Sequence, residues 1–308
     1  MFFLVCRHGG CYIFHQRNKI LPGHGLGDST DWERILRRFL VFQMIVCPRD
    51  NHVRLISQHD HARAAGTIAR NWIGIESLPS PPDELREKVL FAIDNHDVGW
   101  CRSDATPRWD EMTKLPYSFF GITADKAVEI WSEGIDSCAS FHPFSGCLVS
   151  LHFSSLAAGG RRGAPFEVSK VLNGFIHAES KRQEKLDALI EPRHKGTIEN
   201  SVSLLRVCDT LSLLACRAPE ITPPDDDVHP LTQSGLKVKT ANTDDLEISP
   251  WPFSEDSIKL RMPGLLLPGE CFANEKELAE ALPLSEPIVF SSVLRRLSKY
   301  AETDSPQD

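Results

Sequence analysis

Histidine and aspartate side chains in four segments of the sequence could together bind a metal ion. His96 and Asp97 are adjacent at the end of an apolar, helix-like run, and His61 lies upstream of them. His152 and Asp209 follow in later apolar runs. Imidazoles combined with carboxylates suit a divalent transition metal, and Mn, Zn, Fe, Co or Ni would all be chemically acceptable. We therefore predict a site for one or two such ions, in which Asp97 could bridge two metals or hold a water molecule.

The predicted ligands occupy the apolar faces of their helices. Residues three or four apart share a helix face, and on this basis His61 aligns with Ile68, whereas Asp209 follows Leu205. An unpaired charge or imidazole on a buried apolar face is costly, so such groups are normally paired or bound to a metal. A single inward histidine is more often a core residue with its own hydrogen-bond partner. Five convergent polar residues would each need such a partner, which favours the metal site.

Three further residues are weaker ligand candidates. His59 competes with His61, because a helix start displaced by one turn would change which of them points inward. Glu179 lies on an apolar helix face, where a salt bridge with a buried Arg or Lys is the alternative. His177 has the spacing of an additional ligand, but its own face carries polar and charged residues, which favours exposure to solvent.

The elements that must position these residues are mostly helices. Apolar periodicity, capping residues and breakers predict helices over about 57–72, 83–96, 124–139, through 148–152, and over 166–190 and 198–216. Strand-like runs occur before them at 44–47 and 53–56, and after them at 235–239, 245–248, 258–262 and 288–290. The predicted fold is therefore mainly α, a helical bundle with a short N-terminal β-hairpin and a small β-rich C-terminal appendage.

Changes in composition divide the chain into four predicted regions. Residues 1–43 contain breakers and charges with one short helix-like patch, so they are expected to be poorly ordered or outside the functional chain, with Met44 as its start. The helical metal-binding domain is expected over 44–218 and a small β-rich subdomain over 228–297. The tail, 298–308, is expected to be disordered.

Composition limits the class of protein and its partners. The 308 residues are 41% hydrophobic and 25% charged, as in ordinary globular proteins, and the net charge of -8 argues against a nucleic-acid partner. A small phosphate ester stays compatible with this charge, because a metal can supply the positive charge. Nine scattered cysteines without a CxxC pair, and no apolar run long enough for a signal peptide or membrane span, predict a cytoplasmic protein. The sequence does not indicate an oligomeric state.

Several motifs together resemble the domain-of-unknown-function family 3891. One is Asn-His-Asp-Val-Gly-Trp at 95–100, and the others lie at 58–63, 116–119, 148–152 and 208–213. The resemblance extends from about residue 44 to residue 296 and leaves the first 43 residues outside. The family name itself implies no activity.

The order of the candidate ligands is also distantly similar to that of the HD superfamily of helical metal-binding domains. This resemblance implies an HD-like bundle in which His61, His96, Asp97 and Asp209 form the first metal site and His152 contributes to a second. The sequence departs from the pattern because only the outward-facing His177 lies between His152 and Asp209, which argues against a complete second site.

The HD resemblance implies a metal-dependent phosphohydrolase or phosphodiesterase acting on a small phosphorylated compound. His96 and Asp97 would then be its catalytic residues. One alternative is a di-iron oxygenase with a small organic or phosphonate substrate, which would need two irons and a full second set of ligands. Another is a non-catalytic binding module that a metal stabilises.

Overall fold

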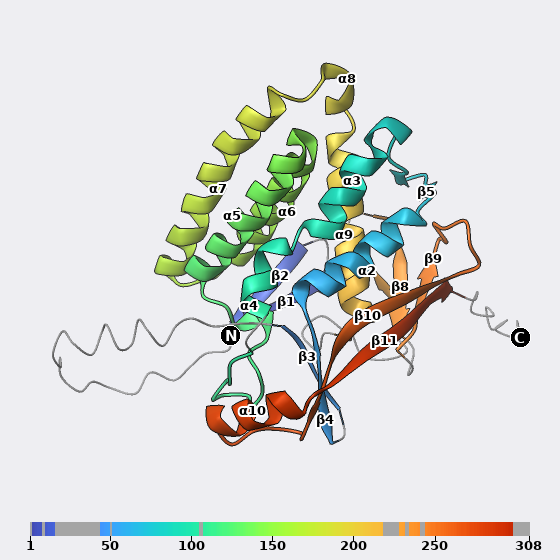
Figure 1. Ribbon diagram of the computed structural model, residues 1–308. Coiled ribbons are helices and arrows are strands. Elements are labelled where there is room, and N and C mark those ends of the chain that lie inside the picture. The colour runs from blue at the N-terminus through green and yellow to red at the C-terminus, as the bar shows by residue number, and fades with distance from the viewer. Residues whose placement is uncertain are drawn as a thin grey trace, which may run out of the picture.

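A body of helices lies beside one large β-sheet (Figure 1). The computed structural model describes residues 2–7, 10–15, 44–49, 51–104, 107–217, 228–231, 234–240 and 244–297. The longer helices are α2 (Gln58–Arg70), α3 (Asp83–Asn95), α5 (Ala124–Phe141), α6 (Pro143–Gly160), α7 (Phe166–Asp187) and α9 (Ile198–Ala215). Five of them begin and end within a few residues of the predicted bounds, and α6 contains the predicted segment 148–152, so the structure confirms these predicted helices.

Shorter helices connect these elements. They are α4 (Cys101–Asp104), α8 (Pro192–Lys195) and α10 (Glu275–Ala281), with 3-10 turns η1 (Val98–Trp100), η2 (Phe119–Gly121) and η3 (Leu282–Leu284). Helix α10 was not predicted from the sequence, although the residues at its start contain a capping signal. Asn274 accepts a hydrogen bond from the backbone N–H of Glu277, whose carboxylate accepts one from the N–H of Ala273. Such reciprocal capping typically marks the start of a helix.

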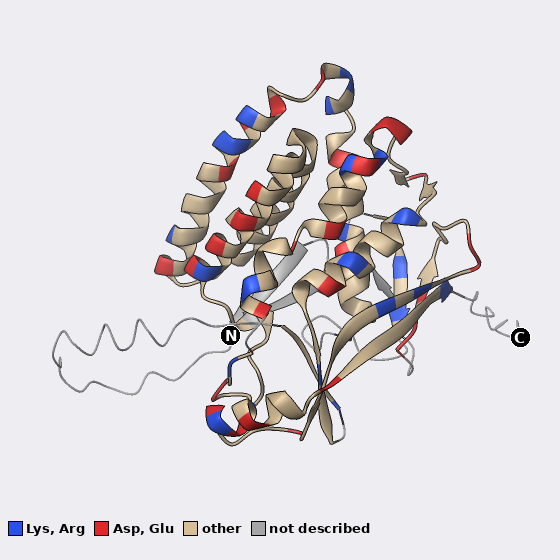
Figure 2. Ribbon diagram, in the orientation of Figure 1, with Lys and Arg blue, Asp and Glu red and all other residues tan. Residues whose placement is uncertain are grey.

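Helix α6 lies at the centre of the helical body. It packs against α3, α5, α7 and α9, and it contains no Lys, Arg, Asp or Glu (Figure 2). By contrast, charged residues mark the outer helices α5 and α7 (Figure 2). His152 therefore stands on the most apolar of the long helices, where a buried imidazole needs a specific reason.

Seven of the described strands form one sheet in the order β3-β4-β10-β11-β9-β8-β7. Its members are β3 (Ile45–Arg49), β4 (His52–Ile56), β7 (Val228–Pro230), β8 (Lys237–Thr240), β9 (Leu246–Ser249), β10 (Ser257–Pro268) and β11 (Glu286–Arg296). β11 and β9 are parallel, and the other neighbours are antiparallel. The sheet is larger than predicted, and the predicted hairpin and C-terminal appendage are parts of the same sheet.

Strand β10 joins the N-terminal strands β3 and β4 to the C-terminal strands of the sheet. It can do so because it continues through Pro263 and Gly264. Its last residues pair with β4, with Leu265 opposite Leu55. A Cβ atom on Gly264 would lie 2.5 Å from the carbonyl oxygen of Leu55 and 2.8 Å from the ring of Phe290. Glycine therefore permits the close approach of the strands at a position where the sequence suggests a break.

One hydrophobic core connects the sheet with the helices. It includes Trp72 after α2, Phe144 and Phe153 on α6, and Leu260 and Leu294 on the two long strands. Helix α2 packs between β10 on one side and α3 and α9 on the other. The helix that carries His61 is thereby fixed between the sheet and the bundle. A smaller cluster, which includes Phe272 and Leu278, lies beneath α10.

The remaining described strands form two small hairpins. β1 (Phe2–Arg7) pairs with β2 (Gly10–His15), and β5 (Gly74–Ile75) pairs with β6 (Leu78–Pro79). The first hairpin was not predicted for the N-terminal extension. The helix-like patch expected near 32–42 and the tail at 298–308 lie outside the described residues. Among the described helices, none combines the length and apolar character that crossing a bilayer requires.

Candidate metal centre

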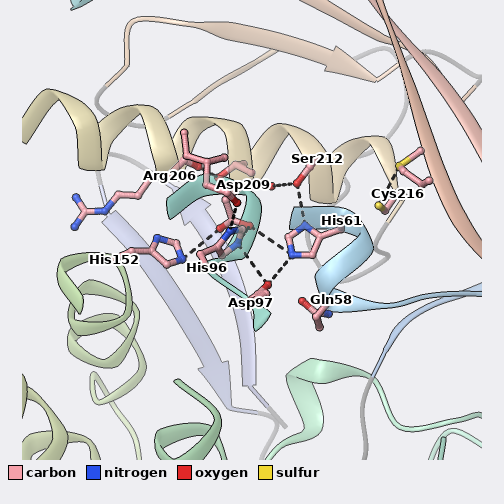
Figure 3. Close-up of polar contacts among 12 residues, drawn as sticks. Gln58, His61, His96, Asp97, His152, Arg206, Asp209, Ser212 and Cys216 are labelled. Atoms are coloured by element: carbon pink, nitrogen blue, oxygen red, sulfur yellow. Dashed lines mark hydrogen bonds and ion pairs between the residues drawn. The ribbon is translucent and has the colours of Figure 1, made fainter. Parts of the chain in front are cut away.

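Three helices and one turn bring the five principal candidate ligands together (Figure 3). Three of them, His61 from α2, His96 after α3 and Asp209 from α9, offer ligand atoms that all lie within 4.8 Å of one another. The Nε2 atoms of His61 and His96 lie 3.9 and 3.5 Å from Oδ1 of Asp209. Oδ2 of Asp97 lies 2.7 Å from Nε2 of His61 and 3.4 Å from Nε2 of His96.

A serine on α9 determines the hydrogen position on His61. The hydroxyl of Ser212 lies 2.8 Å from the carbonyl oxygen of Asp209 and 2.9 Å from Nδ1 of His61. A carbonyl can only accept, so the hydroxyl donates its hydrogen there and accepts from Nδ1–H. In the neutral imidazole, Nε2 then has a free lone pair directed at the carboxylate of Asp97. Metal-binding histidines are typically held in this way by a second hydrogen bond.

His96 is oriented by the backbone of its own helix. Its Nδ1 lies 2.8 Å from the carbonyl oxygen of Ile93, which again requires a hydrogen on Nδ1. Its Nε2 is buried and has no hydrogen-bond partner among the described residues. The Nε2 atoms of His61 and His96 therefore face two carboxylates, and a cation is needed between them. That cation can be a proton or a metal ion.

The charges of the centre stabilise a cation at this position. Burial acts to lower the pKa of His96, but Asp97 and Asp209 together outweigh it and raise this pKa to about 9. Burial acts to raise the pKa of Asp209, yet His96 and the other imidazoles lower it to about 2. Without a metal, His96 therefore retains a proton at neutral pH, and a metal must displace that proton.

Metal affinity should accordingly depend on pH. Below a pKa of about 9, binding to His96 releases a proton, so the apparent affinity is expected to rise about tenfold for each pH unit from 6 to 8. Competition with a chromophoric chelator of known affinity, at several pH values, measures this slope. An affinity that is constant across this range would mean that His96 does not bind the ion.

The hydrogen bond from Ser212 gives a second prediction. Ser212→Ala removes the group that orients His61, so metal affinity is expected to fall about 10- to 100-fold. Ser201→Ala is the matched control, because Ser201 is buried on the same helix and donates to the carbonyl oxygen of Thr197 instead. The same chelator competition measures both variants. Equal affinities would contradict the orienting role of Ser212.

His152 lies beside the centre but outside its closest group of ligand atoms. Its Nε2 is 3.7 Å from Oδ2 of Asp209, and its ring packs edge-on against that of His96 at 5.4 Å. Burial lowers the pKa of His152 to about 4, so the ring is neutral near pH 7. Its Nδ1 is buried without a hydrogen-bond partner among the described residues. This ring could bind a second ion or contact a substrate.

The weaker ligand candidates do not join this group. Glu179 is buried, but it accepts a hydrogen bond of 2.7 Å from Ser150 and pairs with Arg182 at 3.1 Å, as the alternative interpretation held. His177 is exposed on α7. His59 is half-buried and its Nε2 accepts a hydrogen bond from Arg63. A helix face identifies which side chains are buried, but does not show which cluster they enter.

Close packing against α5 fixes the turn that carries His96 and Asp97. A Cβ atom on Gly99 would lie 2.1 Å from the carbonyl oxygen of Ile130, and one on Gly134 would lie 2.8 Å from that of His96. Both contacts involve backbone atoms, so no side-chain rotation could relieve them. Neither glycine was predicted from the sequence to have this role, although Gly99 belongs to the motif at 95–100.

Comparisons with known proteins identify a family but no activity. The model of a family described as "Protein of unknown function (DUF3891)" matches residues 44–269, a range that contains every residue of the centre. No match was found among curated proteins or among solved structures.

Proposed function

We propose, given that this chain belongs to the DUF3891 family, that it is a metal-dependent phosphohydrolase or phosphodiesterase acting on a small phosphorylated compound. One observation carries the proposal: the Nε2 atoms of His61 and His96 face carboxylates, while each Nδ1 is already hydrogen-bonded within the protein. This mixed nitrogen and oxygen donor set fits a divalent transition metal such as Mn, Zn, Fe, Co or Ni.

His61, His96 and Asp209 would hold the ion, and Asp97 would complete the set or orient a water molecule. A bound ion would activate water and stabilise negative charge on a phosphoryl oxygen. Asp97 lies 2.7 Å from His61, so its carboxylate is restrained and can accept a proton from the attacking water. The neutral ring of His152, beside Asp209, is placed to hydrogen-bond to substrate.

The order of these residues on their helices supports an HD-like arrangement of the helical body. A second complete ion site is less well supported, because His177 is exposed and Glu179 is paired with Arg182. Hydrolysis with one tightly held ion therefore agrees better with the described residues than di-iron oxygen chemistry does.

Elemental analysis combined with activity screens tests the proposal. Protein purified without chelator is expected to contain about one transition metal per chain and to release phosphate or hydrolyse phosphodiesters when screened with Mn, Zn, Co, Ni and Fe. Two irons with oxygen consumption would instead identify an oxygenase. Bound metal without turnover would identify a binding module, and absence of metal would overturn the centre itself.

A further inference from the structure

Two buried polar atoms lie at the start of α2, the helix that carries His61, and one of them belongs to Asp104 at the end of α4. Nε2 of Gln58 and Oδ1 of Asp104 are both buried without a hydrogen-bond partner among the described residues. The two residues are only 2% and 8% exposed. Buried polar groups are normally satisfied, so two unsatisfied groups at the start of one helix are candidates for hydrogen bonds to a bound molecule.

The helix start itself does not supply the binding groups. Oδ2 of Asp104 accepts a hydrogen bond of 2.7 Å from the backbone N–H of Gln58. The hydroxyl oxygen of Ser57 accepts one of 2.9 Å from the backbone N–H of Asp60. Asp104 also accepts from the backbone of His59. These bonds occupy the first amides of α2 and fix the carboxyl group of Asp104. Among the described residues, Oδ1 of Asp104 and Nε2 of Gln58 have no hydrogen-bond partner and are left for another molecule.

Both groups lie near the reacting centre. Gln58 precedes His61 by three residues, so the two share one face of α2. In the close-up, the side chain of Gln58 lies on the side of His61 away from α9 (Figure 3). The charge on Asp97 also contributes to the electrostatic environment of Asp104.

The two groups are hydrogen-bond donors at neutral pH. The amide nitrogen of Gln58 can only donate. Burial, with a further contribution from Asp97, raises the pKa of Asp104 to about 8, which favours the protonated carboxyl group. Its Oδ2 accepts from the backbone, so the hydrogen belongs on Oδ1. Two neutral donors at the start of the same helix match an oxygen acceptor.

We propose that Gln58 and Asp104 form a substrate subsite that donates two hydrogen bonds to a phosphoryl oxygen adjacent to the metal centre. The subsite rests on the proposed function, because it requires a phosphorylated substrate. One phosphoryl oxygen of that substrate would contact Gln58 and Asp104 while its reacting atoms lie at the metal centre. Neutral donors can orient a phosphoryl oxygen without an ion pair, so they would accept a singly charged ester as well as a doubly charged one.

Binding of inorganic phosphate to the metal-loaded full chain tests the subsite. Gln58→Leu removes the donor at similar volume and is expected to weaken phosphate binding, measured by calorimetry, at least about tenfold. Its metal content should equal that of the wild type. Gln58→Glu replaces the donor by an acceptor and should weaken binding further, and it serves if the leucine variant does not fold. Gln183→Leu is the matched control, because Gln183 donates to Ser150 and Ser154 on the α6 side of α7.

Asp104→Asn separates the donor role of Asp104 from its capping role. Asparagine keeps an oxygen for the backbone N–H of Gln58 and places an amide donor where the protonated oxygen stood. Phosphate affinity should therefore stay within about threefold of the wild type, whereas Asp104→Leu should lose at least about tenfold.

The outcomes separate the subsite from the proposed function. Wild-type phosphate affinity in metal-loaded Gln58→Leu would overturn the subsite and leave the metal-dependent hydrolase standing. Loss of metal from Gln58→Leu would also overturn the subsite, because Gln58 would then be a residue that positions the metal-binding side chains. A wild-type chain that binds no metal, or binds metal but no phosphate, would contradict the proposed function itself.

Discussion

Replacing Asp209 by alanine is expected to lower metal affinity by more than about 100-fold and to abolish any metal-dependent activity. Asp209 is the carboxylate that lies within 4 Å of His61, His96 and His152, at 3.9, 3.5 and 3.7 Å. Its removal takes away a ligand and the negative charge that favours a cation at this position. Elemental analysis of the purified variant and chelator competition measure the loss.

Asp187→Ala is the matched control for Asp209→Ala. Asp187 ends α7 and pairs with Lys195 at the surface, where an ion pair contributes at most about 1 kcal/mol. Its metal content should equal that of the wild type. If Asp209→Ala retained a full complement of metal with wild-type affinity, the ion would have to lie elsewhere, and the hydrolytic proposal would lose its physical basis.

Helix faces predicted from the sequence account for most of the centre. The stripe that continues from Leu85 through Ile93 directs His96 inward, and the same periodicity favours His61 over His59 on α2. This works because a long amphipathic helix has one buried face, so its period determines the orientation of each side chain. The same reasoning identifies Glu179 as buried but does not reveal that it pairs with Ser150 and Arg182.

Contacts between distant segments could not be predicted from local patterns. Asp104 caps α2 from 46 positions away, and nothing near it in the sequence indicates its partner. The pairing of Leu265 with Leu55 likewise depends on β10 continuing through Pro263 and Gly264, a dipeptide that usually signals a turn. The periodicity of a strand shows which residues alternate, but it does not identify the neighbouring strand. The size of the sheet and the polar cluster beside the centre were therefore beyond the sequence alone.

The tight packing of Gly99 leads to the second large expected effect. A methyl group there would lie 2.1 Å from the carbonyl oxygen of Ile130 and 3.0 Å from the backbone nitrogen of Gly134. Gly99→Ala must therefore move the turn away from α5, and His96 and Asp97 move with it. We expect a loss of about 1–3 kcal/mol in the free energy of unfolding. We also expect at least about tenfold weaker metal binding, because ligand atoms displaced by even a fraction of an ångström no longer converge.

Gly174→Ala is the control that distinguishes this packing effect from a general effect of alanine. No atom lies within 4 Å of a Cβ built on Gly174, which stands inside α7, so alanine should stabilise the protein by about 0.5–1 kcal/mol. Thermal unfolding followed by circular dichroism, with metal content measured on the same samples, compares the two variants. If Gly99→Ala unfolded at the temperature of Gly174→Ala and retained its metal, the turn would not be held by α5. The geometry of the centre would then have to come from the helices alone.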